Sequence, residues 1–527
     1  MSTPSGSTSL NAQQRTRALQ EVGASADDTN SKVDLVVIGG GITGTGIALD
    51  AATRGMSVVL LERNDLGHGT SRWSSKLAHG GLRYLTKLQF GIAHNSAVER
   101  GIIMEHTAPH LVHALPQVTF LADNTSLVQK AAMRVGFLAG DFLRVTAGTS
   151  GKTLPRSRFI NAKKAVEMCP TGFKQGLKGA WVNYDGQMVD DARFVTAVAR
   201  TAAGYGAKII TRAEVTNATG DQVTFTDTLH NEEYTINARG VINATGVWAG
   251  QLDENIKVRP ARGTHLVLDA EKLGNPEGAL TVPLGGSISR YLFILPAPHR
   301  RCYLGLTDED NGDDIPDVPS TPDEDIDFLL DNMNAGLETK LTRDDVLGAF
   351  TGLRPLIDDG SGSDTADLSR RHAILHTDDG MISIVGGKFT EYRLMAEEAV
   401  NDAIKTRGLR KAETKTKDTP LVGAPKHADS RRVLPKDLHG LPDRLVARFG
   451  YEAPAVVRAA TIKRPLEFIG GTDVTRAEVE YAFTHEGALN VDDVLERRTR
   501  LAMVPADADA AHPEVEEIAA HVAESTK

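Results

Sequence analysis

The sequence predicts an α/β fold that begins with a Rossmann-like nucleotide-binding unit. Three observations support it: an apolar run, DLVVIG (34–39), a glycine pattern at Gly39, Gly41 and Gly44, and a second apolar run, SVVLLE (57–62). Short β-branched runs are typical of buried parallel strands, and the apolar residues between them recur at helical spacing. Strand, glycine turn, helix and strand in this order form the unit that binds dinucleotides.

Each position of this unit has a separate physical role. Gly39 allows a tight turn after the first strand, and Gly41 lets the backbone approach a pyrophosphate. Gly44 allows the helix to pack closely on the strand, so that its free N–H groups and positive dipole end face the phosphates. Glu62, at the end of the second strand, stands where a carboxylate can accept a hydrogen bond from a ribose hydroxyl.

The residues after Glu62 favour a flavin over a nicotinamide cofactor. The stretch RNDLGHGTSRWSSKLAHGGLRYL (63–85) is rich in Gly, Ser and Thr and does not continue the alternation of strand and helix. Such a loop can place hydroxyl and N–H groups along a pyrophosphate and an isoalloxazine edge. Two later segments, GVINATG (240–246) and VGGKFT (385–390), indicate that the flavin domain is rebuilt from distant parts of the chain.

The overall composition narrows the class of protein. The 527 residues suffice for two or three domains, and a net charge of -10 argues against a nucleic-acid partner. The chain has two cysteines, which favours a reducing cytoplasm, and no run of about eighteen apolar residues predicts a membrane-spanning helix. Residues 1–31 are rich in Ser, Thr, Asn and Gln and are expected to form a disordered tail.

Seven further blocks carry a resemblance to a known family. In chain order they are TSRWSSKLAHGGLRYL, WVNYDGQMVDDARFV, VINATGVWAG, GLTDED, TGLRPLIDD, VGGKFTEYR and VDDVLERRTRLAM. Together with the glycine motif they resemble the FAD-dependent glycerol-3-phosphate dehydrogenase family, from about Val33 to about Met503. The resemblance implies oxidation of sn-glycerol 3-phosphate to dihydroxyacetone phosphate, with electrons passing from FAD to a membrane quinone.

The resemblance also implies domains of the glutathione-reductase and amino-acid-oxidase type. A Rossmann-like FAD-binding domain is then interleaved with an antiparallel-sheet substrate domain, and a helical C-terminal domain follows. The expected boundaries are 32–125, 185–260 and 345–405 for the FAD-binding domain, 126–184 and 261–344 for the substrate domain, and 418–527 for the C-terminal domain.

Contacts with FAD are expected from the glycine turn, the polar loop and the later glycine-containing segments. The predicted residues are Gly39, Gly40, Gly41, Ile42, Thr43, Gly44, Glu62, Arg63, Thr70, Ser71, Ser74, Ser75, Lys76, Leu77, Gly80, Gly81, Val215, Ala244, Thr245, Gly246, Gly387, Lys388, Phe389 and Thr390. No metal site is predicted.

The implied substrate requires cations that can hold a phosphate dianion. Arg354, in a turn flanked by Gly and Pro, is the first candidate, because a planar guanidinium can donate two hydrogen bonds. Arg83 and Lys388 are the second and third candidates. Tyr84 could hydrogen-bond the phosphate or the C1 hydroxyl, and ordinary aromatic packing explains it equally well.

Two histidines are candidates for the base that removes the hydroxyl proton. His79 precedes a Gly-Gly pair in the polar loop, and His265 lies in the strand-like ARGTHLVLDA (261–270). The residues alone leave both open. The acid pair Asp190–Asp191 is interpreted as a cap of the helix that follows it.

A quinone is lipid-soluble, so contact with a bilayer is expected. Segment 126–145 mixes basic and large apolar residues, as an interfacial amphipathic helix does, and a helix buried on one face of the substrate domain is an equal alternative. We therefore expect a cytoplasmic protein bound peripherally to the inner face of the cell membrane, and a homodimer is compatible with the sequence. The motifs leave two alternatives open: an oxidase that uses oxygen, and an amine or amino-acid oxidase on the same fold.

Overall fold

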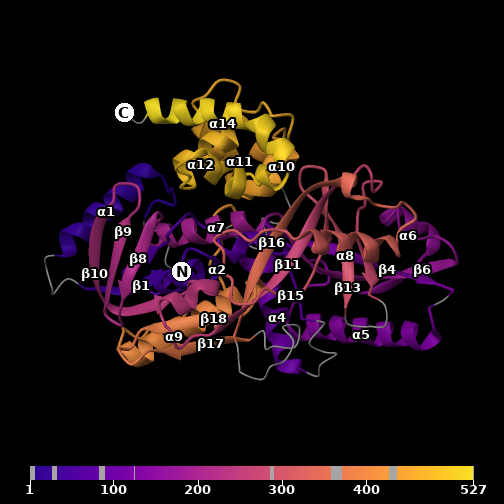
Figure 1. The fold of residues 1–527 in the computed structure, drawn as a ribbon, viewed down its shortest axis with the longest axis horizontal. Helices are drawn as coiled ribbons and strands as arrows, with labels where there is room; N and C mark the ends of the chain where they lie inside the picture. Colours follow the sequence, from indigo (N-terminus) through magenta and orange to yellow (C-terminus); the bar gives the residue numbers. More distant parts are fainter. Residues whose placement is uncertain are drawn as a thin grey trace.

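The computed structural model describes residues 6–26, 32–81, 89–123, 125–284, 290–357, 371–425 and 436–525. Two large β-sheets lie side by side, and the C-terminal helices sit above them in the view of Figure 1. This arrangement confirms the predicted α/β class with a helical C-terminal region.

The first sheet is the expected Rossmann-like sheet. Its strand order is β17-β18-β10-β1-β2-β7, with β9 paired on β10 and β8 on β9. The bounds are Val33–Ile38 (β1), Val58–Leu61 (β2), Lys208–Ile210 (β7), Ala213–Ala218 (β8), Gln222–Asp227 (β9), Glu232–Asn243 (β10), His372–His376 (β17) and Ile382–Gly386 (β18).

Strand β1 lies at the centre of this sheet, parallel to β2 and β10. Leu35 and Val37 pack in the core shared with one set of helices, and Val36 and Ile38 pack in a separate core on the opposite face. Burial on both faces explains why the strand is apolar without alternation. The helices of the first core are α2 (Ile42–Thr53), α7 (Asp191–Gly204) and α9 (Tyr392–Arg407).

The opposite face is covered in part by α1 (Ala12–Ala26), which lies beside β10. Its buried residues Ala18, Leu19 and Val22 join the core of Val36 and Ile38. The prediction of a disordered tail over residues 1–31 is therefore wrong for this helix. A few apolar side chains on one helix face are enough to order it, because the sheet offers a complementary apolar surface.

The second sheet has ten strands and is antiparallel except where β12 runs parallel to β4. Its order is β15-β11-β14-β13-β12-β4-β6-β3, with β16 paired on β11 and β5 on β6. The bounds are Leu77–Ala78 (β3), Val112–Ala122 (β4), Arg158–Asn161 (β5), Leu177–Met188 (β6), Val258–Asp269 (β11), Ala279–Pro283 (β12), Tyr291–Ala297 (β13), Arg301–Gly305 (β14), Glu309–Asp310 (β15) and Val346–Ile357 (β16).

Three of these strands fall outside the domain that the sequence assigned to them. Strands β3, β4 and β16 lie within the expected FAD-binding ranges 32–125 and 345–405, yet all three belong to the second sheet. β16 pairs with β11 along nearly its whole length, and β4 pairs with β6. The chain therefore crosses between the sheets more often than the sequence suggested. Helices α6 (Ala162–Met168) and α8 (Asp323–Asn334) pack on the core of this sheet.

The C-terminal region is a set of short helices with two small apolar cores. Its helices are α10 (Asp443–Phe449), α11 (Ala453–Ala459), α12 (Arg476–His485), α13 (Val491–Asp493) and α14 (Pro505–Ser525).

Helices α4 (Phe90–Ile102) and α5 (Leu127–Thr146) pack together at the edge opposite the C-terminal helices in Figure 1. A capping box formed by Ser126 and Gln129 begins α5. In the part of the chain that the structure describes, no helix is both long enough and apolar enough to cross a bilayer.

Candidate active site

A cavity of about 620 Å³ lies where the carboxyl ends of β1, β2 and β10 face the second sheet. Its walls come from segments far apart in the sequence, including the glycine turn after β1, the loop after β2 and the turn after β18. In parallel α/β sheets, this edge is where ligands bind.

The glycine turn lines the cavity. Gly39 has a φ of +111°, which favours glycine, and a Cβ on Gly44 would lie 1.9 Å from the Gly39 carbonyl oxygen. Only glycine lets α2 approach β1 this closely. The Ile42 N–H at the start of α2 donates to the Ser71 hydroxyl at 2.9 Å. Backbone N–H groups are therefore gathered at a helix N-terminus that faces the cavity.

Glu62 lies beside this turn, as expected for a ribose-binding acid. Its two oxygens accept hydrogen bonds from the N–H groups of Gly40, at 2.6 Å, and Asn64, at 2.8 Å. Burial raises the pKa of Glu62 above its ordinary value. The glycine cradle, the acid and the hydroxyl groups of the loop fit the pyrophosphate and ribose of FAD.

All the predicted cofactor residues except Gly44 and Lys76 line this cavity. Gly44 acts at the helix–strand contact instead. Lys76 has a φ of +56° and is buried beneath the loop, where its Nζ donates to the Ser74 carbonyl at 3.0 Å and pairs with Asp191 at 3.2 Å. Burial lowers the pKa of Lys76 to about 8, although Asp191 opposes the shift. The structure thus gives Lys76 a place under the cofactor loop, contrary to the expectation of a direct contact.

The acid pair before α7 divides into two roles. Asp190 caps the helix, as predicted, by accepting from the Arg193 N–H at 2.8 Å. Asp191 instead accepts from the N–H and the hydroxyl of Ser74, at 2.9 and 2.8 Å. This second carboxylate fixes the loop that carries Ser74 and Lys76 rather than the helix alone.

His79 also lines the cavity, with an acid behind it. Its Nδ1 is 3.1 Å from Asp185, which also accepts from the Gly80 N–H at 3.0 Å and from Arg100 at 2.7 Å. Burial alone would raise the pKa of Asp185, but Arg100 and His79 outweigh it and hold that pKa below its ordinary value. Since Nδ1 donates to this carboxylate, Nε2 is the nitrogen that can accept a proton.

His265 is held differently. Its side chain is buried, its Nε2 is 2.9 Å from the Ser75 hydroxyl, and its ring stacks on Phe350 at 4.7 Å. Burial, with Lys76 and Arg354 nearby, lowers the pKa of His265 well below its ordinary value. His265 is therefore a neutral ring that orients Ser75.

Two of the predicted phosphate cations line the cavity. Arg354 pairs with Asp308 at 2.7 Å, and Lys388 donates to Ser96 at 2.9 Å and pairs with Glu391 at 3.1 Å. Each cation is thus oriented by a carboxylate. Arg83 and Tyr84 lie outside the described residues.

Sequence reasoning missed the acids that orient these groups. Asp185 follows an aromatic residue inside β6, and an acid within a largely buried strand is a signal that could have identified it. Arg100 in α4 and Asp308 before β15 carry no comparable signal. Arg144 of α5 also lines the cavity, a position that the amphipathic pattern of segment 126–145 does not predict.

Comparisons with known proteins agree with this geometry. Residues 34–393 match the FAD dependent oxidoreductase family, and residues 414–527 match the C-terminal domain of alpha-glycerophosphate oxidase. The chain is 54% identical to glycerol-3-phosphate dehydrogenase 1 of Mycobacterium tuberculosis (strain H37Rv), over 95% of this chain and 96% of that protein. It is 34% identical to a mitochondrial glycerol-3-phosphate dehydrogenase of Arabidopsis thaliana, over 94% of this chain and 83% of the relative.

Solved structures show the same fold. Glycerol-3-phosphate dehydrogenase from Bacillus halodurans, complexed with FAD, superposes with a TM-score of 0.72 at 25% identity, covering 98% of this chain and 97% of that one. The L-alpha-glycerophosphate oxidase of Mycoplasma pneumoniae, with FAD bound, has a TM-score of 0.55 at 14% identity, covering 74% of this chain and 99% of that one. This second likeness concerns the fold alone.

Replacing Gly44 with alanine tests the glycine cradle. Because its Cβ would lie 1.9 Å from the Gly39 carbonyl oxygen, α2 must move away from β1, and we expect the purified variant to lose most of its bound flavin. Flavin absorbance per polypeptide measures the loss. Gly91→Ala is the matched control, since a Cβ at this helical position meets nothing within 4 Å. Normal flavin content in Gly44→Ala would contradict the assignment.

Proposed function

The chain belongs to the FAD-dependent glycerol-3-phosphate dehydrogenase family, and we propose that it oxidises sn-glycerol 3-phosphate to dihydroxyacetone phosphate and passes the electrons to a membrane quinone. The observation that carries the proposal is that one cavity is lined by two kinds of group. A glycine cradle that fits FAD lines it, and so do an acid-backed histidine and two oriented cations.

The cations hold the substrate by its phosphate. Arg354, oriented by Asp308, and Lys388, oriented by Glu391, supply positive charge on the side of the cavity formed by β16 and the turn after β18. Binding at the phosphate then fixes the distance between the substrate carbon and the cofactor, since the rest of the molecule is short.

Oxidation of the alcohol removes one proton and one hydride. Bound FAD supplies the hydride acceptor. The hydroxyl proton passes to Nε2 of His79, the C–H bond breaks with both of its electrons, and a C=O bond forms. Asp185 stabilises the imidazolium that results. We favour His79 over His265 as the base because the low pKa of His265 makes its ring a poor proton acceptor.

The proposed acceptor is supported by the outer face of α5. Six large apolar side chains of this helix are 43–83% exposed: Leu127, Val128, Val135, Leu138, Phe142 and Val145. We call them the α5 stripe. The same helix contributes Phe137 and Arg144 to the cavity wall, so a surface suited to a bilayer interface adjoins the site of oxidation. We therefore propose peripheral membrane contact through α5, with quinone arriving from that side.

Anaerobic addition of glycerol 3-phosphate to the purified protein tests the reaction. We expect the flavin absorbance to bleach and to return when a quinone is added.

An absorbance that does not change on addition of substrate would contradict the proposed function. Rapid reoxidation by oxygen with formation of peroxide, and none by quinone, would instead favour the oxygen-using oxidase.

Replacing Asp185 with asparagine tests the role of His79. Loss of the carboxylate removes the partner that stabilises the imidazolium, so we expect kcat/KM to fall by about 10- to 100-fold. This is less than the roughly 100- to 10,000-fold that general acid–base catalysis contributes as a whole, because His79 itself remains. Asp141→Asn is the control, since Asp141 lines the same cavity but accepts from Ser157. A kcat/KM in Asp185→Asn equal to that of Asp141→Asn would remove His79 from the role of base.

Replacing three residues of the α5 stripe tests membrane contact. We expect Val135→Ser, Leu138→Ser and Phe142→Ser together to abolish most co-sedimentation with liposomes, because the apolar area that enters the interface is lost. The control replaces three exposed apolar residues elsewhere, Leu229, Val318 and Phe468, with serine. Equal partitioning of the two triple variants would exclude α5 as the contact.

A further inference from the structure

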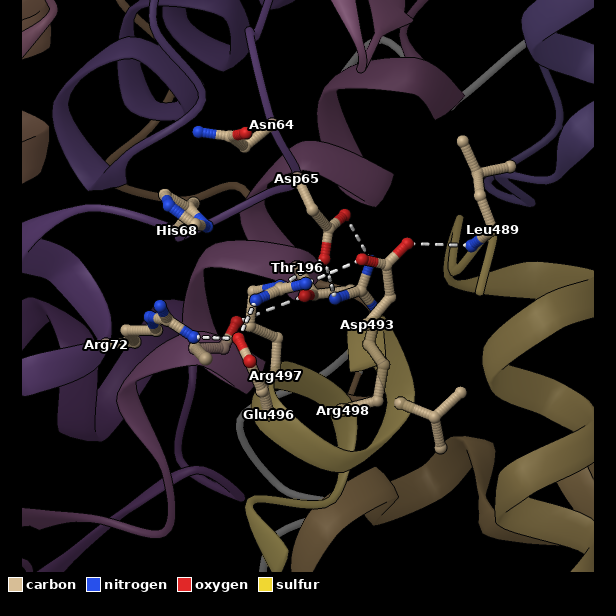
Figure 2. Close-up of polar contacts among 12 residues, drawn as sticks. Asn64, Asp65, His68, Arg72, Thr196, Leu489, Asp493, Glu496, Arg497 and Arg498 are labelled. Carbon is tan, nitrogen blue, oxygen red and sulfur yellow. Dashed lines mark hydrogen bonds and ion pairs between the residues drawn. The ribbon is translucent and has the colours of Figure 1, made fainter. Parts of the chain in front are cut away.

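Buried arginines of the C-terminal region reach into the cofactor domain from the segment Val494–Met503, which spans the turns η9 (Val494–Arg498) and η10 (Leu501–Met503). Arg498 donates two hydrogen bonds to Asp65, at 2.8 and 2.9 Å, and Arg497 donates a third at 2.6 Å (Figure 2). These side chains are 1–4% exposed. The start of the loop after β2 is thus held by two guanidinium groups, one of them bidentate.

The segment Val494–Met503 also contacts the loop after β2 at a second residue, Arg72. Arg72 pairs with Glu496, while Arg500 donates to the Arg72 carbonyl and lies over the Trp73 ring, 5.1 Å from its centre. Glu496 also pairs with Arg497, so the two points of attachment belong to one network (Figure 2).

Between these two points lies a wall of the cofactor cavity. The turn η1 (Thr70–Trp73) and Gly69 line the cavity, and the Thr70 hydroxyl donates to the Leu353 carbonyl at 2.7 Å. Ser71 in this turn accepts from the Ile42 N–H of the glycine cradle. The distance between the wall and the cradle therefore depends on how the C-terminal segment holds Asp65 and Arg72.

The charges of this network contribute more to fixing the position of the loop after β2 than to the stability of the fold. Burial would raise the pKa of Asp65, but Arg498 and Arg497 outweigh it and lower that pKa. A fully paired buried network adds little net stability, because desolvation offsets the attraction, whereas a missing partner leaves an uncompensated charge. The network therefore favours one docked geometry over others. Its members are Asp65, Arg72, Arg212, Asp493, Glu496, Arg497 and Arg498.

We propose that Arg497, Arg498 and Arg500 are positioning residues for the cofactor site, so that docking of the C-terminal segment and binding of FAD are thermodynamically coupled. FAD binds more tightly when the segment is docked, and by linkage bound FAD strengthens the docking. The inference rests on FAD as the cofactor, and it depends on neither the substrate nor the electron acceptor of the proposed function.

The experiment compares Arg498→Met with Arg448→Met. Arg448 is a matched control because it is also buried and pairs with Asp473 and Glu478 inside the C-terminal region. Release of FAD from each purified holoenzyme on dilution is followed by flavin fluorescence. We expect Arg498→Met to weaken FAD binding by about tenfold or more, a typical coupling between sites, and Arg448→Met to leave it within about twofold. Equal FAD affinities in the two variants would overturn the proposal.

A second variant and a second measurement test the same coupling if Arg498→Met does not fold. Glu496→Gln removes a charge whose side chain is 37% exposed, and we expect it to fold and to weaken FAD binding several-fold. Hydrogen exchange of residues 494–503 should slow when FAD is added to the wild-type protein and to Arg448→Met, but less so in Glu496→Gln. Exchange that FAD leaves unchanged in the wild-type protein would also overturn the coupling.

Discussion

The close contact between α2 and β1 is the constraint on which the rest of the structure depends. With no side chain on Gly44, the helix begins directly over the end of the strand, and its N–H groups face the carboxyl edge of the sheet. β2 and β10 end at the same edge because they run parallel to β1. Glu62 and the Ala244–Gly246 turn follow these two strands directly and therefore line the cavity.

Buried and half-buried carboxylates hold other polar groups in place around this cavity. Asp185 orients His79, Asp191 holds Ser74 and Lys76, Asp308 orients Arg354, and Asp65 anchors the loop after β2. In a medium of low dielectric, an ion pair contributes more to the choice of one geometry than to net stability. The site is thus a set of polar groups whose positions are fixed by acids behind them.

The α5 edge of the molecule and its C-terminal helices differ in the side chains that they contribute. The α5 stripe offers apolar side chains to the surroundings, while the C-terminal helices lie across the molecule from it and contribute buried arginines to the cofactor loop (Figure 1). The cavity is lined both by α5 and by the loop that the C-terminal segment contacts, so the proposed lipid-borne acceptor and that segment would approach it from different sides.

The sequence by itself determined the features that depend on local spacing. The glycine pattern, the apolar β1 and the acid at Glu62 predicted the nucleotide unit, because each role needs only neighbouring residues. Partners far apart in the chain decided the rest. α1 is ordered by the face of a distant sheet, β16 joins the second sheet through β11, and Lys76 turns toward Asp191. Only the tertiary structure brings such charges and strand edges together, because no spacing along the chain records which buried group will compensate another.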